Sequence, residues 1–387
     1  TPQESFCFKV LILFVIVMII GVFKAIIFGA REISSGFAEV IIITSIFTFF
    51  LFIIFDSIRK NYFGSIIELV GISLFGLLLL NILGVLFGVE NSGLSSNYNK
   101  EIASNFDFMG ERLKFPFMTS GQLLAIQAGF VMIVGFFKYM NKINPLHTLL
   151  GIFMMMSAAF ILLANGGRSS LIITFGAILF ASFIRLSRPF LVPILSLFLL
   201  FPLLVLINFG AIIEIAFNFV GLEMSRTEGD IASFSNRDII YASSIGLFVT
   251  QTDTTSMLFG YGTFGQVTSG ISQTYIPLFE NSYSNPDSVH THNSAIQIMI
   301  DYGLLGLILF VFLIFRLAKI SKKTLLYKSR FEKKCFNQNI YITLLLYIIG
   351  TSITEVSITY YSFGILSMFY IINMLIIFDR VNLKLNS

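Results

Sequence analysis

Long apolar runs, bounded by short polar segments, dominate the pattern of this chain. Crossing a bilayer takes about 20 residues of α-helix, and the shorter runs reach that length by adding a few polar residues. The ten candidate spans are Cys7–Phe28, Ala38–Phe55, Phe63–Val89, Gln122–Phe137, Pro145–Ala164, Leu171–Ile184, Pro189–Phe209, Ser294–Phe315, Ile340–Ser352 and Ile358–Phe378. The pattern therefore predicts an all-α polytopic integral membrane protein with about ten (ten to twelve) transmembrane helices.

Basic residues between the runs indicate the orientation of the chain. With the N-terminus inside and alternating spans, most of the 25 basic residues fall on one side, including the cluster from Arg316 to Lys334. Cytoplasmic loops carry such an excess of lysine and arginine. Residues 316–339 are therefore predicted to form a basic cytoplasmic loop.

Two predicted outward segments are longer than ordinary connectors. One is an outer loop at residues 90–121, and the other is a large loop at residues 210–293. The second contains Asp238–Val249, whose apolar residues recur at helical spacing, so short helices are expected within it. Residues 1–387 as a whole read as a single integral membrane domain.

Composition excludes several classes of protein. At 56% hydrophobic and 12% charged residues, the chain has too few charges to cover a soluble globule. The net charge of +4 is scattered between apolar runs, which speaks against nucleic acid as a partner. Cys7 and Cys335 are too few for a disulfide framework, and no set of histidine, cysteine and acidic residues has the sequence spacing of a metal site, so none is expected.

Within Ser288–Phe315, a polar histidine turn, His290–Asn293, leads directly into the apolar run Ser294–Phe315. Histidine has an unperturbed pKa near 6.5, so His292 is the side chain best suited to take up a proton at neutral pH. His290 and Asn293 flank it; the alternative is a structural histidine at a membrane interface. Asp301 lies about 14 Å further along the predicted helix, too far to orient His292 directly, and is expected to face a polar bundle interior.

Two arginines are candidates for binding phosphate. Arg168 lies in the glycine-containing turn Asn165–Ser170, and its planar fork of donors suits phosphate oxygens. The alternative is an arginine that reaches toward lipid headgroups. Arg237 has its own alternative, a solvated charge paired with Asp238. Arg226 is a weaker candidate in the same loop.

Several glycines follow recognisable spacings. Gly260–Gly265 matches G-x-G-x-x-G, but no βαβ pattern surrounds it, so a tight turn is predicted rather than a dinucleotide site. Gly303 and Gly306 are predicted to permit close packing of helices.

Three stretches follow one another along the chain: Asn165–Leu171, then Asn236–Asp238 with Leu258–Gly262, then His292–Asn293 with Tyr302–Gly306. In this order they resemble the O-antigen polymerase and ligase superfamily of bacterial membrane glycosyltransferases. The resemblance covers about residues 165–315. The position after the second arginine, which is apolar and usually aromatic in the family, is Tyr241 here, a mild departure.

The resemblance implies a GT-C-type fold and an inverting, metal-independent transfer of a glycan from an undecaprenyl diphosphate donor, without a cofactor. His292 would be the catalytic general base, and Arg168 and Arg237 would hold the diphosphate. The candidate supporting residues are His290, Asn293, Tyr241 and Arg226. The implied partners are lipid-linked oligosaccharide donor and acceptor, membrane lipids and a chain-length regulator protein.

The same resemblance places the protein in the bacterial inner (cytoplasmic) membrane, with residues 210–293 as a periplasmic cap over the active site. Three functions stay open. A polymerase joins lipid-linked repeat units and is favoured by the Gly-Gly-Arg-Ser turn and the Phe-Gly-Tyr-Gly stretch. A ligase moves finished polymer onto lipid A-core by the same chemistry. A non-catalytic transporter or flippase predicts ionisable residues near the membrane midplane and two related halves, which the sequence does not display.

Overall fold

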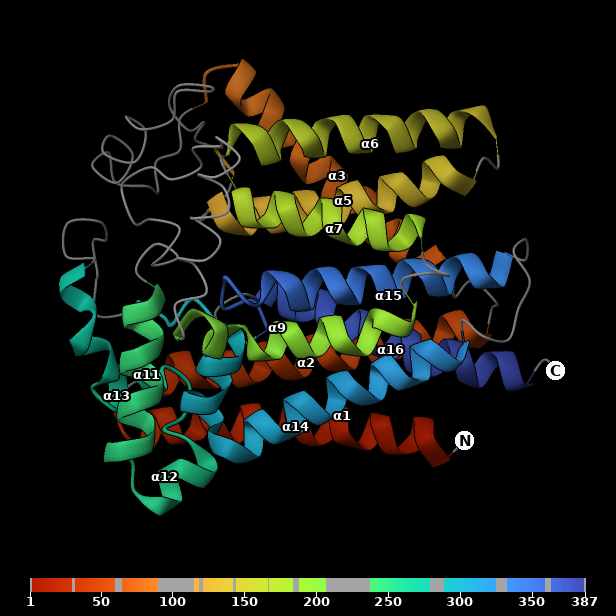
Figure 1. Cartoon of the computed structure of the whole chain (residues 1–387). Coiled ribbons are helices and arrows are strands. Elements are labelled where there is room, and N and C mark those ends of the chain that lie inside the picture. The colour runs from red at the N-terminus through yellow and green to blue at the C-terminus, as the bar shows by residue number, and fades with distance from the viewer. Residues whose placement is uncertain are drawn as a thin grey trace.

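The structure is a computed structural model in which every regular element of the described residues is a helix (Figure 1). It contains no strand within these residues. It describes residues 2–29, 32–59, 65–89, 115–117, 121–141, 144–165, 167–183, 188–206, 237–278, 289–324, 333–358 and 363–385.

Long helices make up the body of the molecule, and short helices precede α14. The long helices are α1 (Pro2–Ile27), α2 (Ile33–Arg59), α3 (Ser65–Leu86), α5 (Gly121–Asn141), α6 (Pro145–Ala164), α7 (Arg168–Ser182), α9 (Leu191–Leu206), α14 (Ser294–Thr324), α15 (Lys333–Thr351) and α16 (Phe363–Leu385). The short elements are η1 (Arg188–Phe190), α11 (Arg237–Gln251), α12 (Thr254–Phe259), α13 (Gly265–Thr268), η2 (Ile271–Thr274) and η3 (Ile276–Leu278).

Each of the ten predicted apolar runs coincides with one of the long helices. Within the described part of the chain, 6 helices are long and apolar enough to cross a membrane: Ser5–Ile27, Ile33–Asp56, Ile66–Leu86, Gln122–Asn141, Pro145–Ala164 and Ser294–Ile320. The shorter apolar helices are Ser169–Ser182, Leu191–Leu206, Asn339–Thr351 and Ile365–Phe378. The prediction of an all-α polytopic membrane protein is confirmed.

Figure 1 shows the long helices side by side, with both chain ends at one end of the bundle and α11, α12 and α13 at the other. We call the segment 237–278 the cap. The termini and the cap lie on opposite sides, as the predicted alternation of spans requires. Which side faces the periplasm stays a prediction.

Close packing joins the first and last thirds of the chain. Phe14 of α1 stacks on Phe310 of α14 with ring centroids 6.1 Å apart. The Tyr347 hydroxyl of α15 donates to the Ile126 carbonyl of α5 at 2.8 Å. These contacts pack α14 against α1 and α15 against α5, and His292 and Glu355, described below, lie just before α14 and just after α15.

A second apolar cluster fixes the cap to the bundle. Tyr241 and Phe248 of α11 pack with Ile271 of η2 and Ile300 of α14, and all four side chains are at most 2% exposed. Helix α11 covers the stretch Asp238–Val249, so the predicted short helix is confirmed. Its apolar face packs against the bundle, because burial of that face stabilises a helix of this length.

The segment 316–339 differs from the predicted basic loop. Helix α14 continues past the predicted end of the span to Thr324, and α15 already begins at Lys333. The reason is that Leu317 and Ala318 are fully buried against the bundle, so the helix continues where its apolar face still has partners. Residues 325–332 lie outside the described residues, as do most of the outer loop 90–121 and residues 210–236 and 279–288 of the large loop.

Gly303 does permit a close approach, because a Cβ there would collide with the backbone of Leu258 in α12, but it does so at a kink and not within a regular helix. Gly303 has a φ of 69° and ψ of −170°, so it interrupts α14 with a kink rather than continuing it. A positive φ favours glycine because a Cβ atom clashes with the backbone there. Gly306 leaves room for Tyr302, one turn earlier in the same helix.

Candidate active site

The histidine turn is held in place by its own polar side chains. The Asn293 side-chain oxygen accepts from the backbone N–H groups of Ala295 at 2.9 Å and Ile296 at 3.0 Å, and so caps the start of α14. His292 has a φ of 53°, in the left-handed region that non-glycine residues rarely adopt. Such a conformation costs on the order of 1 kcal/mol and persists only where surrounding contacts enforce it.

A second turn, residues 352–358 after α15, is bound to the histidine turn by Ser294. The Ser294 backbone N–H donates to the Ser352 carbonyl at 2.9 Å, and its hydroxyl donates to the Glu355 carbonyl at 3.0 Å. The same hydroxyl accepts from the Ser357 N–H at 2.9 Å. The Asn293 amide adds a bond to the Ile353 carbonyl at 2.9 Å. These contacts fix Glu355 beside His292.

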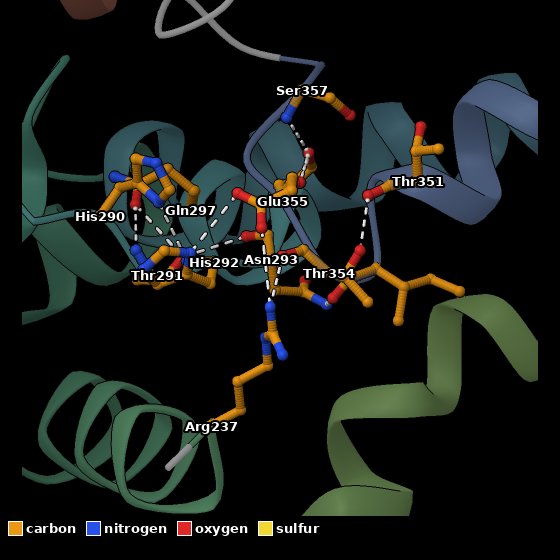
Figure 2. A network of polar contacts seen from close by, with 12 residues as sticks. Arg237, His290, Thr291, His292, Asn293, Gln297, Thr351, Thr354, Glu355 and Ser357 are labelled. Atoms are coloured by element: carbon orange, nitrogen blue, oxygen red, sulfur yellow. Dashed lines mark hydrogen bonds and ion pairs between the residues drawn. The ribbon is translucent and has the colours of Figure 1, made fainter. Parts of the chain in front are cut away.

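Glu355 receives two basic side chains (Figure 2). One carboxylate oxygen lies 3.4 Å from Nδ1 of His292, and the other lies 3.6 Å from Nη2 of Arg237. Arg237 also donates to the Thr354 carbonyl at 3.2 Å. The side chains of His292 and Glu355 are each 10% exposed, so water screens these contacts less than it would at the surface. A carboxylate at Nδ1 favours a proton there and leaves Nε2 as the basic nitrogen.

Tyr241 connects the cap to both turns. Its hydroxyl lies within donor distance of two carbonyls, that of Ile353 at 3.0 Å and that of His292 at 3.3 Å. Burial raises the pKa of Tyr241 to about 12, although the charge of Arg237 acts in the opposite direction. The phenol therefore keeps its proton and remains a donor at neutral pH.

His290 lies directly against His292. The two rings meet edge to face with centroids 4.5 Å apart, and Nδ1 of His290 accepts from the His292 backbone N–H at 3.2 Å. Burial lowers the pKa of His290 well below its usual value, and the neighbouring His292 and Arg237 lower it further. His290 is thus neutral at neutral pH and acts here as a hydrogen-bond acceptor.

One group of side chains has the types and proximity of a metal site. Ligand atoms of His290, His292 and Glu355 all lie within 4.8 Å of one another. No such set was expected from spacing in the sequence. Two histidines and a carboxylate suit a transition metal such as zinc. The guanidinium of Arg237 already lies on the same carboxylate and would repel a cation placed there.

The remaining candidate arginines are placed only in part. Arg168 is the first residue of α7, and its side chain lies outside the described residues. The start of α7 lies near the end of α15, since a Cβ on Gly350 would touch Ile173 of α7 at 2.6 Å. The backbone of Arg168 is therefore near the helix that leads into Glu355. Arg226 lies outside the described residues.

Glu355 was not predicted from the sequence. It lies 63 residues after His292, in a short turn between the last two apolar runs, and no motif connects the two positions. One signal was present. If spans alternate, the turn after Ile340–Ser352 faces the same side as the histidine turn, and it carries a single acidic residue. An acidic side chain on that side of the membrane was a candidate partner for a histidine base.

Part of the chain matches a known protein family. Residues 151–311 match the family model described as O-antigen ligase. This stretch, which is less than half of the chain, is similar to proteins of that family. The match includes α7, the cap and the kinked helix α14, and it ends before the turn that carries Glu355. No curated protein and no solved structure matches the chain.

This similarity supports a coarse role in glycosyl transfer. The site has the parts that such a transfer needs. His292 supplies a base with a carboxylate at its second nitrogen, and Arg237 supplies a planar cation beside it.

Proposed function

We propose that the protein is an O-antigen polymerase that elongates lipid-linked repeat units. The growing glycan moves from undecaprenyl diphosphate to a terminal sugar hydroxyl of another lipid-linked unit, with inversion at the anomeric carbon. The observation that carries the proposal is Glu355, which contacts both His292 and Arg237. A base and a cation held by one carboxylate fit a reaction in which a hydroxyl loses a proton while a diphosphate leaves.

In the proposed step one proton is transferred, one bond forms and one bond breaks. His292 accepts the proton of the acceptor hydroxyl at Nε2, and the acceptor oxygen forms a bond to the anomeric carbon. The bond from that carbon to the diphosphate oxygen breaks, and its electron pair leaves with the diphosphate. Arg237 and Arg168 stabilise the charge on that leaving group through bidentate hydrogen bonds. Glu355 stabilises the imidazolium that forms on His292.

The reaction needs no metal in this proposal, because the two arginines supply the positive charge. We place the site on the periplasmic face of the inner membrane, where the cap 237–278 and the start of α14 lie opposite the termini (Figure 1). The outward position of the cap follows from the excess of basic residues near the other ends of the spans.

A ligase that transfers finished polymer to lipid A-core is the second candidate. The family match favours it, because the matching model carries the description O-antigen ligase. Polymerase and ligase share the donor and the chemistry and differ in the acceptor. The described residues 237–358 therefore serve either function.

The deciding experiment uses purified protein in detergent with EDTA and a lipid-linked oligosaccharide repeat as the sole acceptor. A ladder of longer lipid-linked chains, absent with His292→Ala, supports a metal-independent polymerase. Transfer that occurs only after lipid A-core is added supports the ligase. A His292→Ala protein that folds and makes normal product would refute the role of His292.

A further inference from the structure

The glycine loop Gly260–Gly265 is inserted into the kink of α14. The backbone N–H groups of Tyr261 and Gly262 donate to the carbonyls of Ile300 at 2.9 Å and Asp301 at 2.8 Å. The kink removes the helical partners of carbonyls at this point, so the loop satisfies groups that the helix does not. A Cβ on Gly260 would collide with the Asp301 carbonyl. The backbone of the glycine loop therefore lies directly against the backbone of α14 at the kink, with no room for a side chain at Gly260.

Asp301 extends this contact toward the histidine turn. Its Oδ1 accepts from the Gly265 backbone N–H at 2.9 Å and from Nε2 of Gln297 at 2.8 Å. Asp301 is fully buried, as expected from the sequence. It does not touch His292, so any influence on the base passes through Gln297.

Gln297 lies one turn before Asp301 and uses both ends of its amide. Nε2 donates to Asp301 and to the Gln266 side-chain oxygen at 2.7 Å. Oε1 accepts from Thr291, from the backbone N–H and from the hydroxyl, both at 3.2 Å. Gln297 is 0% exposed. Asp301 and Gln266 fix which end of the amide faces Thr291, because only the oxygen can accept there.

We propose that Gln297 is a positioning residue for the transfer reaction. Its amide, oriented by Asp301 and Gln266, holds Thr291 and thereby the left-handed backbone of His292 that directs the imidazole to Glu355 (Figure 2). The cap loop, docked at the kink, is thus coupled to the base. This inference rests on the proposed function of His292.

If Gln297 served only to fill space, its side chain would need a given volume but no particular polar atoms. The arrangement here requires an acceptor on one side and donors on the other. The Thr291 hydroxyl lies within donor distance of two acceptors, the Asn293 carbonyl at 3.0 Å and Oε1 of Gln297 at 3.2 Å, and its single proton serves one of them at a time. Thr291 therefore has hydrogen-bond partners both within the histidine turn, at Asn293, and in α14, at Gln297.

The test compares Gln297→Met with Gln127→Met in purified, monodisperse protein. Gln127 is a buried glutamine of α5, 7% exposed and outside this network, so it receives the same change in side chain as a matched control. A small misplacement of a catalytic group costs about 10²-fold in rate. We expect Gln297→Met to lower kcat by about this factor with KM for the lipid-linked donor changed less than about twofold. Gln127→Met keeps the wild-type kcat.

Two further variants keep the test decisive where Gln297→Met does not fold. Thr291→Val removes only the hydroxyl and should lower kcat by about tenfold, as the loss of about 1.4 kcal/mol of positioning would. Asp301→Asn keeps an acceptor oxygen for Gln297 and should retain more activity than Asp301→Leu, which fills the space but has no acceptor. Such a rescue separates the orientation of Gln297 from the filling of space.

Several outcomes would overturn the positioning role. One is that Gln297→Met and Thr291→Val both have the same kcat as Gln127→Met. Another is that kcat falls but KM rises by the same factor. A wild type that transfers no glycan to either acceptor refutes the proposed function, and the positioning role with it. An active wild type with an inactive His292→Ala and a fully active Gln297→Met refutes the positioning role alone.

Discussion

Glu355→Gln removes the charge that His292 and Arg237 share and keeps the shape of the side chain. Two unit charges at the 3.4 Å between Glu355 and His292 attract by up to about 5 kcal/mol at an effective dielectric constant near 20. The carboxylate is shared with Arg237, and residual water screens it, so about half of that value is expected in the transition state. A loss of about 2 to 3 kcal/mol corresponds to a kcat lower by about 30- to 150-fold.

The assay measures initial rates of chain elongation with the lipid-linked repeat, at saturating donor and acceptor. Glu68→Gln is the matched control, because Glu68 forms an ion pair of similar length, 3.3 Å, with Lys138 between α3 and α5. The control should keep the wild-type rate within about twofold, because this pair lies between α3 and α5 and includes none of the residues of the candidate site. A wild-type kcat for Glu355→Gln, in protein that unfolds at the wild-type temperature, would refute a part for this carboxylate in catalysis.

Three further predictions concern neighbours of Glu355. Arg237→Lys should raise the Kd for the lipid-linked donor and lower kcat, because a point charge cannot form the bidentate contact; unchanged donor binding in a titration argues against a diphosphate at Arg237. Tyr241→Phe leaves the carbonyls of His292 and Ile353 without this donor and should cost about 1 to 3 kcal/mol of stability, seen as a lower midpoint of thermal unfolding. Because folding lowers the pKa of His290, the unfolded chain binds more protons below about pH 6.5, and stability should fall as the pH drops through that value. His290→Gln should reduce this loss in melting curves at about pH 7.5 and pH 5.5, and an unaltered loss contradicts the assignment.

Local patterns predicted the helices of this protein well, because their causes are local. An apolar run of spanning length has few alternatives to a helix in a membrane, and every predicted run is one. The apolar spacing in Asp238–Val249 predicted α11 for the same reason, since one side of the helix packs against the bundle. Even Asp301 follows this rule, because a carboxylate within an apolar run must find polar partners inside the protein.

Contacts between distant segments could not be predicted in the same way. Gly303 has the spacing of a packing glycine, and only the presence of the loop Gly260–Gly265 against it shows that it makes a kink. Glu355 acts on His292 because α15 returns to the start of α14, and hydropathy carries no information on which helices are neighbours. The sequence therefore predicted His292 and Arg237 as candidate site residues but not Glu355, which contacts both of them.

The bonds from Ser294 to the turn 352–358 also have a consequence for the order of events during synthesis. The base is translated before its carboxylate, with α15 between them, so His292 meets Glu355 only after α15 has entered the membrane and its following turn has emerged. Helical hairpins insert as the chain grows, and domains form in that order. A nascent chain that has reached only α14 thus carries His292 without its carboxylate partner, and on the proposed function it would become active only when these two turns have met.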